Sequence, residues 1–104
     1  MEVVEVFRAL GDPVRLEMVR RLAAGEPHTI STVSSQLNIT RQGARKHLQV
    51  LVDAKIIALN PHGRDTEVRL LRDTLDQGKA FIANLELQWD KRLVALRTFV
   101  ERRQ

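Results

Sequence analysis

The sequence ISTVSSQLNITRQGARKHLQVLVDA, residues 30–54, decides the fold of this chain. It contains two short segments with apolar residues at helical spacing, joined at Asn38. Asparagine tolerates the left-handed backbone conformation that a sharp turn requires. Ser31 and Thr40 stand where the N-caps of the two helices are expected. The pattern predicts a helix-turn-helix over about residues 31–54, in which the second helix can enter the major groove of DNA.

The second helix of this motif is predicted to have an apolar face and a polar face. The apolar, inward face consists of Ala44, Leu48, Leu51 and Val52. Arginine and glutamine in the first turn of a recognition helix can form bidentate hydrogen bonds with guanine and adenine. We expect the base-reading residues to be Arg41, Gln42 and Arg45. We expect contacts with DNA phosphates from Thr40, Lys46, His47 and Gln49.

Three residues in and after this helix need a further explanation. His47 lies beside the apolar face, so a hydrogen bond at a helix junction explains it as well as a phosphate contact does. Gly43 costs about 0.5–1 kcal/mol relative to alanine inside a helix. This cost indicates a close approach of the backbone to DNA or to the preceding helix. Lys55 occupies the turn after the helix, where glycine is easier to accommodate.

Two helices are predicted before the motif. Val3, Phe7 and Leu10 recur at helical spacing in the first ten residues, and Gly11 ends that helix. Asp12 then caps a second helix, because its carboxylate can accept hydrogen bonds from free N–H groups. Pro13 fits the first helical position, where a missing N–H costs nothing.

A β-hairpin is predicted directly after the motif. Residues 56–59 form a short apolar strand, residues 60–65 have the composition of a turn, and residues 66–70 alternate in polarity. A hairpin in this position is typical of the wing of a winged helix, here about residues 56–71. We expect His62 and Arg64 at its tip to reach an adjacent minor groove or the DNA backbone.

The remaining chain, about residues 72–101, is predicted to be one long helix. Its apolar seam has spacings of 3, 4, 3, 4, 4, 3 and 4 residues, as in a coiled coil, and consists of Leu75, Gly78, Ile82, Leu85, Trp89, Leu93, Leu96 and Val100. A helix about 45 Å long exceeds the width of such a domain. We therefore expect a homodimer with an interface of Phe7, Ile82, Leu85, Trp89, Leu93 and Leu96. The alternative is that the helix folds back on its own domain.

Composition limits the class of protein. The 104 residues suit one domain, residues 1–104, and they contain no cysteine, which excludes disulfides, thiolate metal sites and thiol redox sensing. No apolar run is long enough for a membrane span, so we expect a cytoplasmic protein.

Residues 38–72 carry seven basic and three acidic side chains, a net charge of +4 that equals the excess of the whole chain. A local positive field of this kind favours a polyanion such as double-stranded DNA.

The chain resembles the ArsR-type winged-helix repressors over nearly its whole length. The similar stretches are LGDPVRLEMVRRLAAGE (10–26), SSQLNITRQGARKHLQVLVDAKII (34–57), HGRDTEVRLL (62–71) and WDKRLVALRTFVE (89–101). The resemblance implies a homodimer built from the first and last helices. It also implies that the fourth helix reads the major groove of a palindromic operator, and that binding represses transcription by occluding a promoter.

The sequence departs from this family where its metal sensors bind their ions. Those sensors have a Cys-x-Cys motif in the third helix, where this chain has Thr29-Ile30-Ser31. None of these side chains is a soft thiolate ligand. Other members use Asp/His pairs on the last helix, and this last helix contains no histidine. We therefore expect no metal and no cofactor, and the sequence indicates no inducer.

Taken together, the sequence predicts a mostly α-helical winged helix-turn-helix with a small β-hairpin wing, which dimerises through its N- and C-terminal helices. The predicted function is that of a sequence-specific DNA-binding repressor. The alternative is a protein-interaction module that uses the C-terminal apolar helix, because a fold does not fix a function. An enzyme is not expected, since there is no nucleophile motif, no phosphate-binding glycine loop and no metal cluster.

Overall fold

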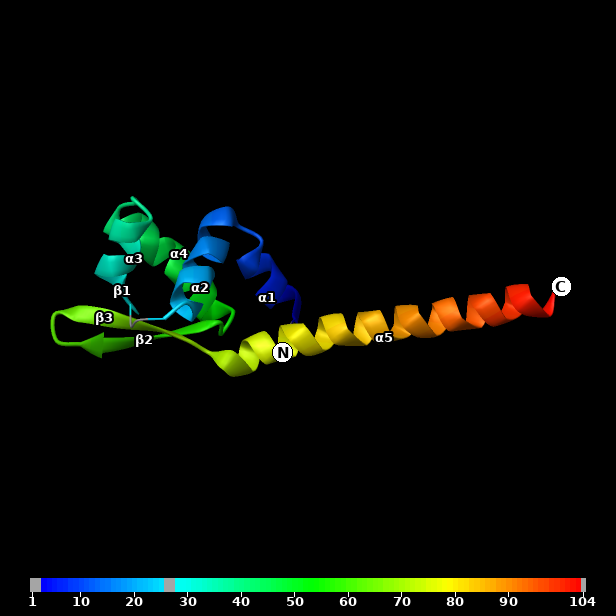
Figure 1. Cartoon of the computed structure of the whole chain (residues 1–104). Coiled ribbons are helices and arrows are strands. Elements are labelled where there is room, and N and C mark those ends of the chain that lie inside the picture. The colour runs from blue at the N-terminus through cyan, green and yellow to red at the C-terminus, as the bar shows by residue number, and fades with distance from the viewer. Residues whose placement is uncertain (1–2, 26–27, 104) are drawn as a thin grey trace.

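The computed structural model describes residues 3–25 and 28–103, which form five helices and a small sheet (Figure 1). The elements follow one another as α1 (Val3–Leu10), α2 (Pro13–Ala23), β1 (His28–Thr29), α3 (Ile30–Gln36), α4 (Arg41–Asp53), β2 (Ile57–His62), β3 (Asp65–Leu70) and α5 (Arg72–Arg102). The predicted mostly helical winged helix-turn-helix is confirmed. Helices α1 to α4 and the sheet form one body, and α5 extends far beyond it, so that the molecule measures 71 × 24 × 23 Å.

Helix α2 begins where the sequence predicts it. The Asp12 carboxylate accepts hydrogen bonds from the N–H groups of Val14 (2.8 Å) and Arg15 (3.1 Å), and Pro13 is the first helical residue. The N–H of Arg15 is the main cause of a lowered pKa of Asp12. The Asp12 cap therefore carries a negative charge at neutral pH, which suits the positive end of the helix dipole.

Further along α2, Glu17 forms ion pairs with Arg20 (2.6 Å) and Arg21 (2.8 Å). The hydrogen bonds from Arg20, and then those from Arg21, lower the pKa of Glu17 from 4.5 to about 2. A carboxylate whose pKa falls on folding stabilises the protein above its unfolded pKa, and that contribution disappears as the pH falls through its folded pKa. We expect Glu17→Gln to reduce the free energy of unfolding at pH 6, and we expect this loss to shrink as the pH falls from 4.5 towards 2. Urea unfolding of both proteins at pH 6 and pH 3 measures the change, and an unchanged difference would contradict it.

Helix α3 starts two residues earlier than predicted. Thr29, not Ser31, is its N-cap: the Thr29 side chain accepts from the N–H of Thr32, and the Thr32 hydroxyl accepts from the N–H of Thr29 at 2.9 Å. This reciprocal pair of bonds is a capping box. The Ser31 prediction is wrong because a threonine pair three residues apart satisfies two N–H groups, whereas a single serine satisfies one.

The turn between α3 and α4 has the predicted conformation. Asn38 has a φ of 55°, in the left-handed region. Thr40 is the N-cap of α4, and its hydroxyl accepts from the N–H of Gly43 at 2.9 Å. A Cβ atom at Gly43 would lie 3.1 Å from the same hydroxyl, which is a tight contact. Gly43 is thus explained by its own helix cap, and not by the contact with α3 considered from the sequence.

The wing lies within the predicted residues, but its strands are longer and its turn shorter than predicted, and the sheet has a third strand. Strand β2 continues through Pro61 to His62, and β3 begins at Asp65, so the turn consists of Gly63 and Arg64 alone. Gly63 has a φ of 63°. Strand β1 pairs with β3 in the antiparallel order β1-β3-β2. The two residues of β1 are too few to show an alternating pattern, so no sequence pattern predicts this strand.

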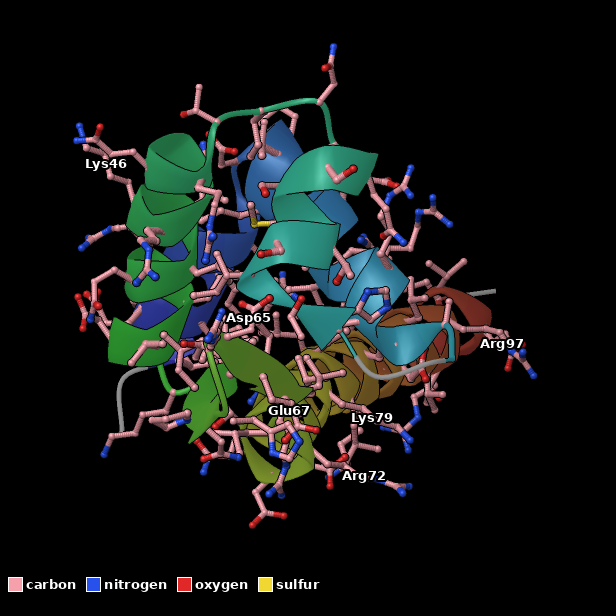
Figure 2. All side chains as sticks on the ribbon, turned by 90° about the vertical axis from the view of Figure 1, so that its left-hand side faces the viewer. Lys46, Asp65, Glu67, Arg72, Lys79 and Arg97 are labelled. Carbon is pink, nitrogen blue, oxygen red and sulfur yellow. The ribbon has the colours of Figure 1, made fainter. Side chains whose placement is uncertain are left out.

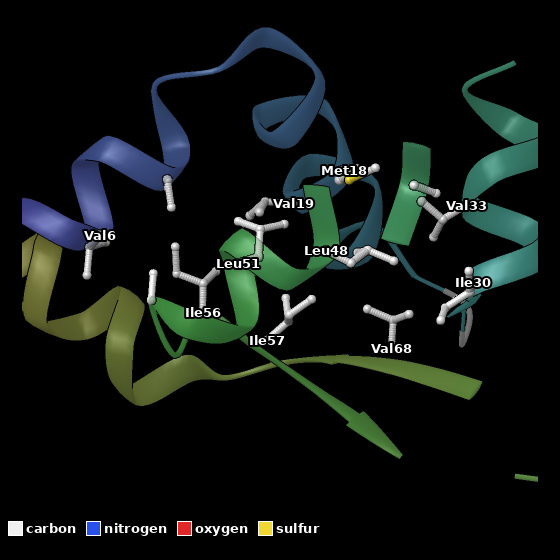
Figure 3. Close-up of a cluster of buried hydrophobic side chains, with 13 residues drawn as sticks. Val6, Met18, Val19, Ile30, Val33, Leu48, Leu51, Ile56, Ile57 and Val68 are labelled. Atoms are coloured by element: carbon white, nitrogen blue, oxygen red, sulfur yellow. The ribbon is translucent and has the colours of Figure 1, made fainter. Parts of the chain in front are cut away.

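The hydrophobic core lies between the helices and the sheet (Figure 3). Ala44, Leu48 and Leu51 enter it from α4, as predicted, and Val52 is partly buried against it. Val6 and Met18 enter it from α1 and α2. The core fixes the rotation of α4 about its axis, because the buried residues of one helix face determine which residues face outwards.

Gly78 packs the start of α5 against α1. A Cβ atom there would lie 3.8 Å from Val6 Cγ1 and 3.9 Å from Phe7 Cζ, ordinary van der Waals distances. We expect Gly78→Ala to raise the free energy of unfolding by about 0.5–1 kcal/mol, because alanine is favoured over glycine inside a helix. Thermal unfolding measures this change. Gly63→Ala is the control with the opposite expected result: it should lower the stability, because Gly63 has a left-handed backbone conformation that alanine adopts only with strain. A destabilised Gly78→Ala variant would contradict the packing described here.

Candidate nucleic-acid interface

The outward face of α4 is polar and basic. Because Ala44, Leu48 and Leu51 are buried, the opposite side of the helix faces solvent. The predicted residues that are exposed on α4 or at its cap are Thr40, Arg41, Gln42, Arg45, Lys46 and Gln49. Figure 2 shows Lys46 projecting from α4 away from the body. Gln49 also donates a hydrogen bond to Asp53, one turn later on the same helix, at 2.8 Å.

His47 lies at the junction of α4 and α2. Its Nδ1 is 3.3 Å from Arg15 Nη1 and 4.0 Å from Asp12 Oδ1, and its side chain is half-buried. Arg15 also donates through Nε to the carbonyl of Ala9, at the end of α1, at 2.7 Å. This network links three helices through the Asp12 cap. It supports the helix-junction interpretation of His47, while its contact with a DNA phosphate stays a prediction.

The tip of the wing is exposed and contains the other two predicted residues. His62 ends β2, Arg64 lies in the turn, and both side chains face solvent. The first turn of α4 contacts the wing through an ion pair, in which Arg41 Nη2 lies 3.7 Å from Asp65 Oδ1. The first turn of α4 and the start of β3 therefore form one continuous surface.

Asp65 is a residue of this surface that the sequence does not predict. The turn composition of residues 60–65 places it in the turn of the hairpin, whereas it is the first residue of β3 and contacts α4. Only the pairing of β1 with β3 brings the wing close to the start of α3, and that pairing has no sequence pattern of its own. The one sign in the sequence is an acidic residue directly after Arg64, at the basic tip of the wing.

The predicted dimer residues lie along the projecting part of α5. All residues from 79 to 103 are exposed, which excludes the alternative that the helix folds back on its own domain. The exposed apolar side chains there include Ile82, Leu85, Trp89, Leu93 and Leu96. At the base of this seam Phe7 of α1 contacts Phe81, with the ring centroids 5.8 Å apart. Phe81 was not among the predicted interface residues, and it extends the apolar surface towards α1.

Within residues 3–25 and 28–103, no three His, Asp or Glu side chains come together in a group suited to a metal ion. Over the same residues, none of the helices combines the length and the apolar character that a membrane crossing needs.

Known proteins are similar to this chain in sequence and in structure. A family model described as a helix-turn-helix domain matches residues 10–60. The uncharacterized HTH-type transcriptional regulator YdfF of Bacillus subtilis (strain 168) is 32% identical over 68 residues, 65% of this chain and 30% of YdfF. The chain thus matches less than a third of the length of that relative.

Two solved structures extend the comparison. An ArsR-like transcriptional regulator from Rhodococcus sp. RHA1 has a TM-score of 0.81 at 27% identity, and the match covers 93% of this chain and 91% of that one. The homodimeric winged helix-turn-helix DNA-binding domain from Mycobacterium bovis shares the fold, with a TM-score of 0.66 at 19% identity over 81% of this chain and 78% of that one. Together with the helix-turn-helix, the wing and the long α5, these matches show that the chain has the winged helix-turn-helix fold of the ArsR-family transcriptional regulators to which it is similar.

Proposed function

We propose that this protein is a homodimeric, sequence-specific DNA-binding repressor that acts in the cytoplasm on a palindromic operator. The observation that carries the proposal is the joint surface of α4 and the wing. The exposed residues Arg41, Gln42 and Arg45 lie on one side of α4, and the wing meets the first of them through Asp65. A recognition helix in the major groove would thus place His62 and Arg64 beside the adjacent backbone or minor groove.

In this proposal the residues divide between base reading and anchoring. Arg41, Gln42 and Arg45 read base edges, because guanidinium and amide groups match the major-groove pattern of guanine and adenine. The side chains assigned to phosphates and to the groove beside the wing are Thr40, Lys46, His47, Gln49, His62 and Arg64. Phosphate contacts fix the register of a protein on DNA without reading its sequence.

The dimer is proposed from the unpaired apolar seam of α5. A helix of 31 residues with its apolar side chains in water is unfavourable, since each square ångström of apolar surface that is buried stabilises by roughly 25 cal/mol. A second copy offers the same seam by symmetry, as in a two-fold dimer. Phe7 and the seam residues Ile82, Leu85, Trp89, Leu93 and Leu96 would form the interface. The solved domain from Mycobacterium bovis is itself described as homodimeric.

The test is fluorescence anisotropy of the purified protein with DNA. The probe is a labelled duplex selected by the protein from a random library, and the competitor is an unrelated duplex. Binding that survives the competitor and weakens steeply with salt supports the proposal, because Lys and Arg that neutralise phosphates release counterions. A two-fold site with half-site centres about 34–36 Å apart is expected for a dimer of this fold. No selected sequence, or binding that does not change with salt, would contradict the proposal.

A second candidate function follows from the same exposed helix. If the seam of α5 binds a foreign helix, the winged helix serves as a scaffold for a protein partner. A stoichiometric partner in a pull-down, together with no DNA binding by the pure protein, would favour this alternative. The basic face of α4 favours the DNA-binding function.

The reading residues are tested by single substitutions. We expect Arg41→Ala and Gln42→Ala each to weaken binding to the selected operator by about 1–3 kcal/mol and to relax discrimination at one base pair. Lys46→Ala is the matched control on the same helix. It should weaken binding to all sequences alike and reduce the salt dependence. Unchanged base discrimination in the Arg41 and Gln42 variants would show that another face of α4 reads the DNA.

A further inference from the structure

Asp65 stands where three parts of the domain meet. It is the first residue of β3, opposite His62 in the register, and its side chain is 31% exposed. Its carboxylate accepts a hydrogen bond from the N–H of Thr66 at 2.8 Å. Figure 2 shows Asp65 between α4 and the start of α3, above the sheet.

The surroundings of Asp65 keep it charged. The N–H of Thr66 lowers the pKa of the carboxyl most, followed by the hydroxyls of Ser31 and Thr29, and the positive charge of Arg41 lowers it further. Ser31 and Thr29 belong to α3 and its cap, so polar groups of the wing and of α3 both favour the charged form of the carboxyl. At neutral pH a fixed negative charge therefore faces the beginning of α4.

Arg41 is the residue that this charge faces. It is the first residue of α4, its side chain is 54% exposed, and its Nη2 lies 3.7 Å from Asp65 Oδ1. A long exposed arginine otherwise samples many rotamers, and ordering it on binding costs free energy. A partner carboxylate on a rigid strand reduces that freedom before DNA arrives.

We propose that Asp65 is the positioning residue for Arg41 and thereby increases the sequence specificity of the DNA-binding function proposed above. Asp65 acts in two ways. It holds the guanidinium on the wing side of the first turn of α4, so that Arg41 approaches bases from one direction. Its negative charge also competes with phosphates for the guanidinium of Arg41, and phosphates carry no sequence information.

The experiment compares Asp65→Asn with Glu67→Gln. Asparagine keeps the size of the side chain and an oxygen that can accept from Thr66, but it loses the charge. Glu67→Gln removes an equal charge two residues along the same strand, from a side chain for which the described part of the chain shows no ion pair. Both are measured as the ratio of affinities for the selected operator and for the same operator mutated at the base pair read by Arg41.

We expect Asp65→Asn to lower this ratio by about two- to fivefold, the range that an exposed ion pair supplies, and to bind unrelated DNA more tightly. Glu67→Gln should leave the ratio unchanged. In an Arg41→Ala background, Asp65→Asn should have no further effect on the ratio, because the residue through which it acts is gone. Equal ratios for Asp65→Asn and the wild type would overturn the proposal.

A second measurement needs no DNA. The NMR order parameter of the Arg41 side-chain Nε–H should fall in Asp65→Asn and stay unchanged in Glu67→Gln. If it does not fall, Asp65 does not position Arg41. If it falls but the wild type selects no DNA sequence, the positioning is real and the proposed function, with the specificity that depends on it, is wrong.

Discussion

Replacing Trp89 by alanine should weaken the proposed dimer by about 3–5 kcal/mol, the usual loss when a buried tryptophan is truncated. This corresponds to a dissociation constant raised roughly 10²- to 10⁴-fold. In the single chain the Trp89 side chain is 58% exposed, although it lies near the middle of the α5 seam. Such a large apolar side chain contributes most when a second copy covers it. Sedimentation velocity over a range of concentrations measures the change.

The matched control for this substitution is Leu87→Ala. Leu87 is 53% exposed on the same helix, but it lies two residues from Trp89 and outside the seam. We expect this variant to dimerise like the wild type. Because Trp89 is the only tryptophan in the sequence, its fluorescence gives a second readout: the emission of the wild type should shift to the red as the dimer dissociates on dilution. An equally tight dimer in Trp89→Ala would place the interface elsewhere.

The second large effect concerns the core beneath the recognition helix. Leu48 is fully buried, with 0% of its surface exposed, and Leu48→Ala should lower the free energy of unfolding by about 2–5 kcal/mol. A small domain is stable by only about 5–15 kcal/mol, so this variant should be close to unfolding at physiological temperature. Urea unfolding at one fixed protein concentration measures the change, since dimerisation makes stability depend on concentration.

Val50→Ala provides the comparison on the same helix. Val50 is exposed, so its truncation should change the free energy of unfolding by less than about 1 kcal/mol. Comparing the two variants shows whether the loss of stability comes from the burial of Leu48 or from any truncation of a side chain on α4. Similar losses in both would contradict the assignment of Leu48 to the core.

Most of the local signals in the sequence predicted the structure correctly, and the N-cap of α3 is the exception, since Thr29 takes the place predicted for Ser31. Asp12 and Thr40 cap the helices that they were predicted to cap, and Asn38 and Lys55 have φ values of 55° and 61°. These features depend on residues within four positions of one another, so they can be recognised without the fold. The faces of α4 follow from helical spacing for the same reason.

The contacts between distant segments could not be predicted. The pairing of His28-Thr29 with β3, the ion pair of Arg41 with Asp65 and the network around His47 each join parts of the chain at least 24 residues apart. None of these residues has a local pattern that indicates its partner. Their positions follow from how the sheet and α2 pack on the helix-turn-helix.

Pro61 reduces the tendency of the exposed edge of the wing to pair with strands of other molecules. It lies within β2, opposite Thr66, and β2 is the outer strand of the sheet. Proline is accommodated in such a strand when its nitrogen, which has no hydrogen to donate, points away from the neighbouring strand. An extended segment that approached the open edge of β2 would therefore lack one of the backbone N–H donors that it needs for pairing. Pro61 therefore makes the exposed edge of the wing a poorer template for the addition of a further strand.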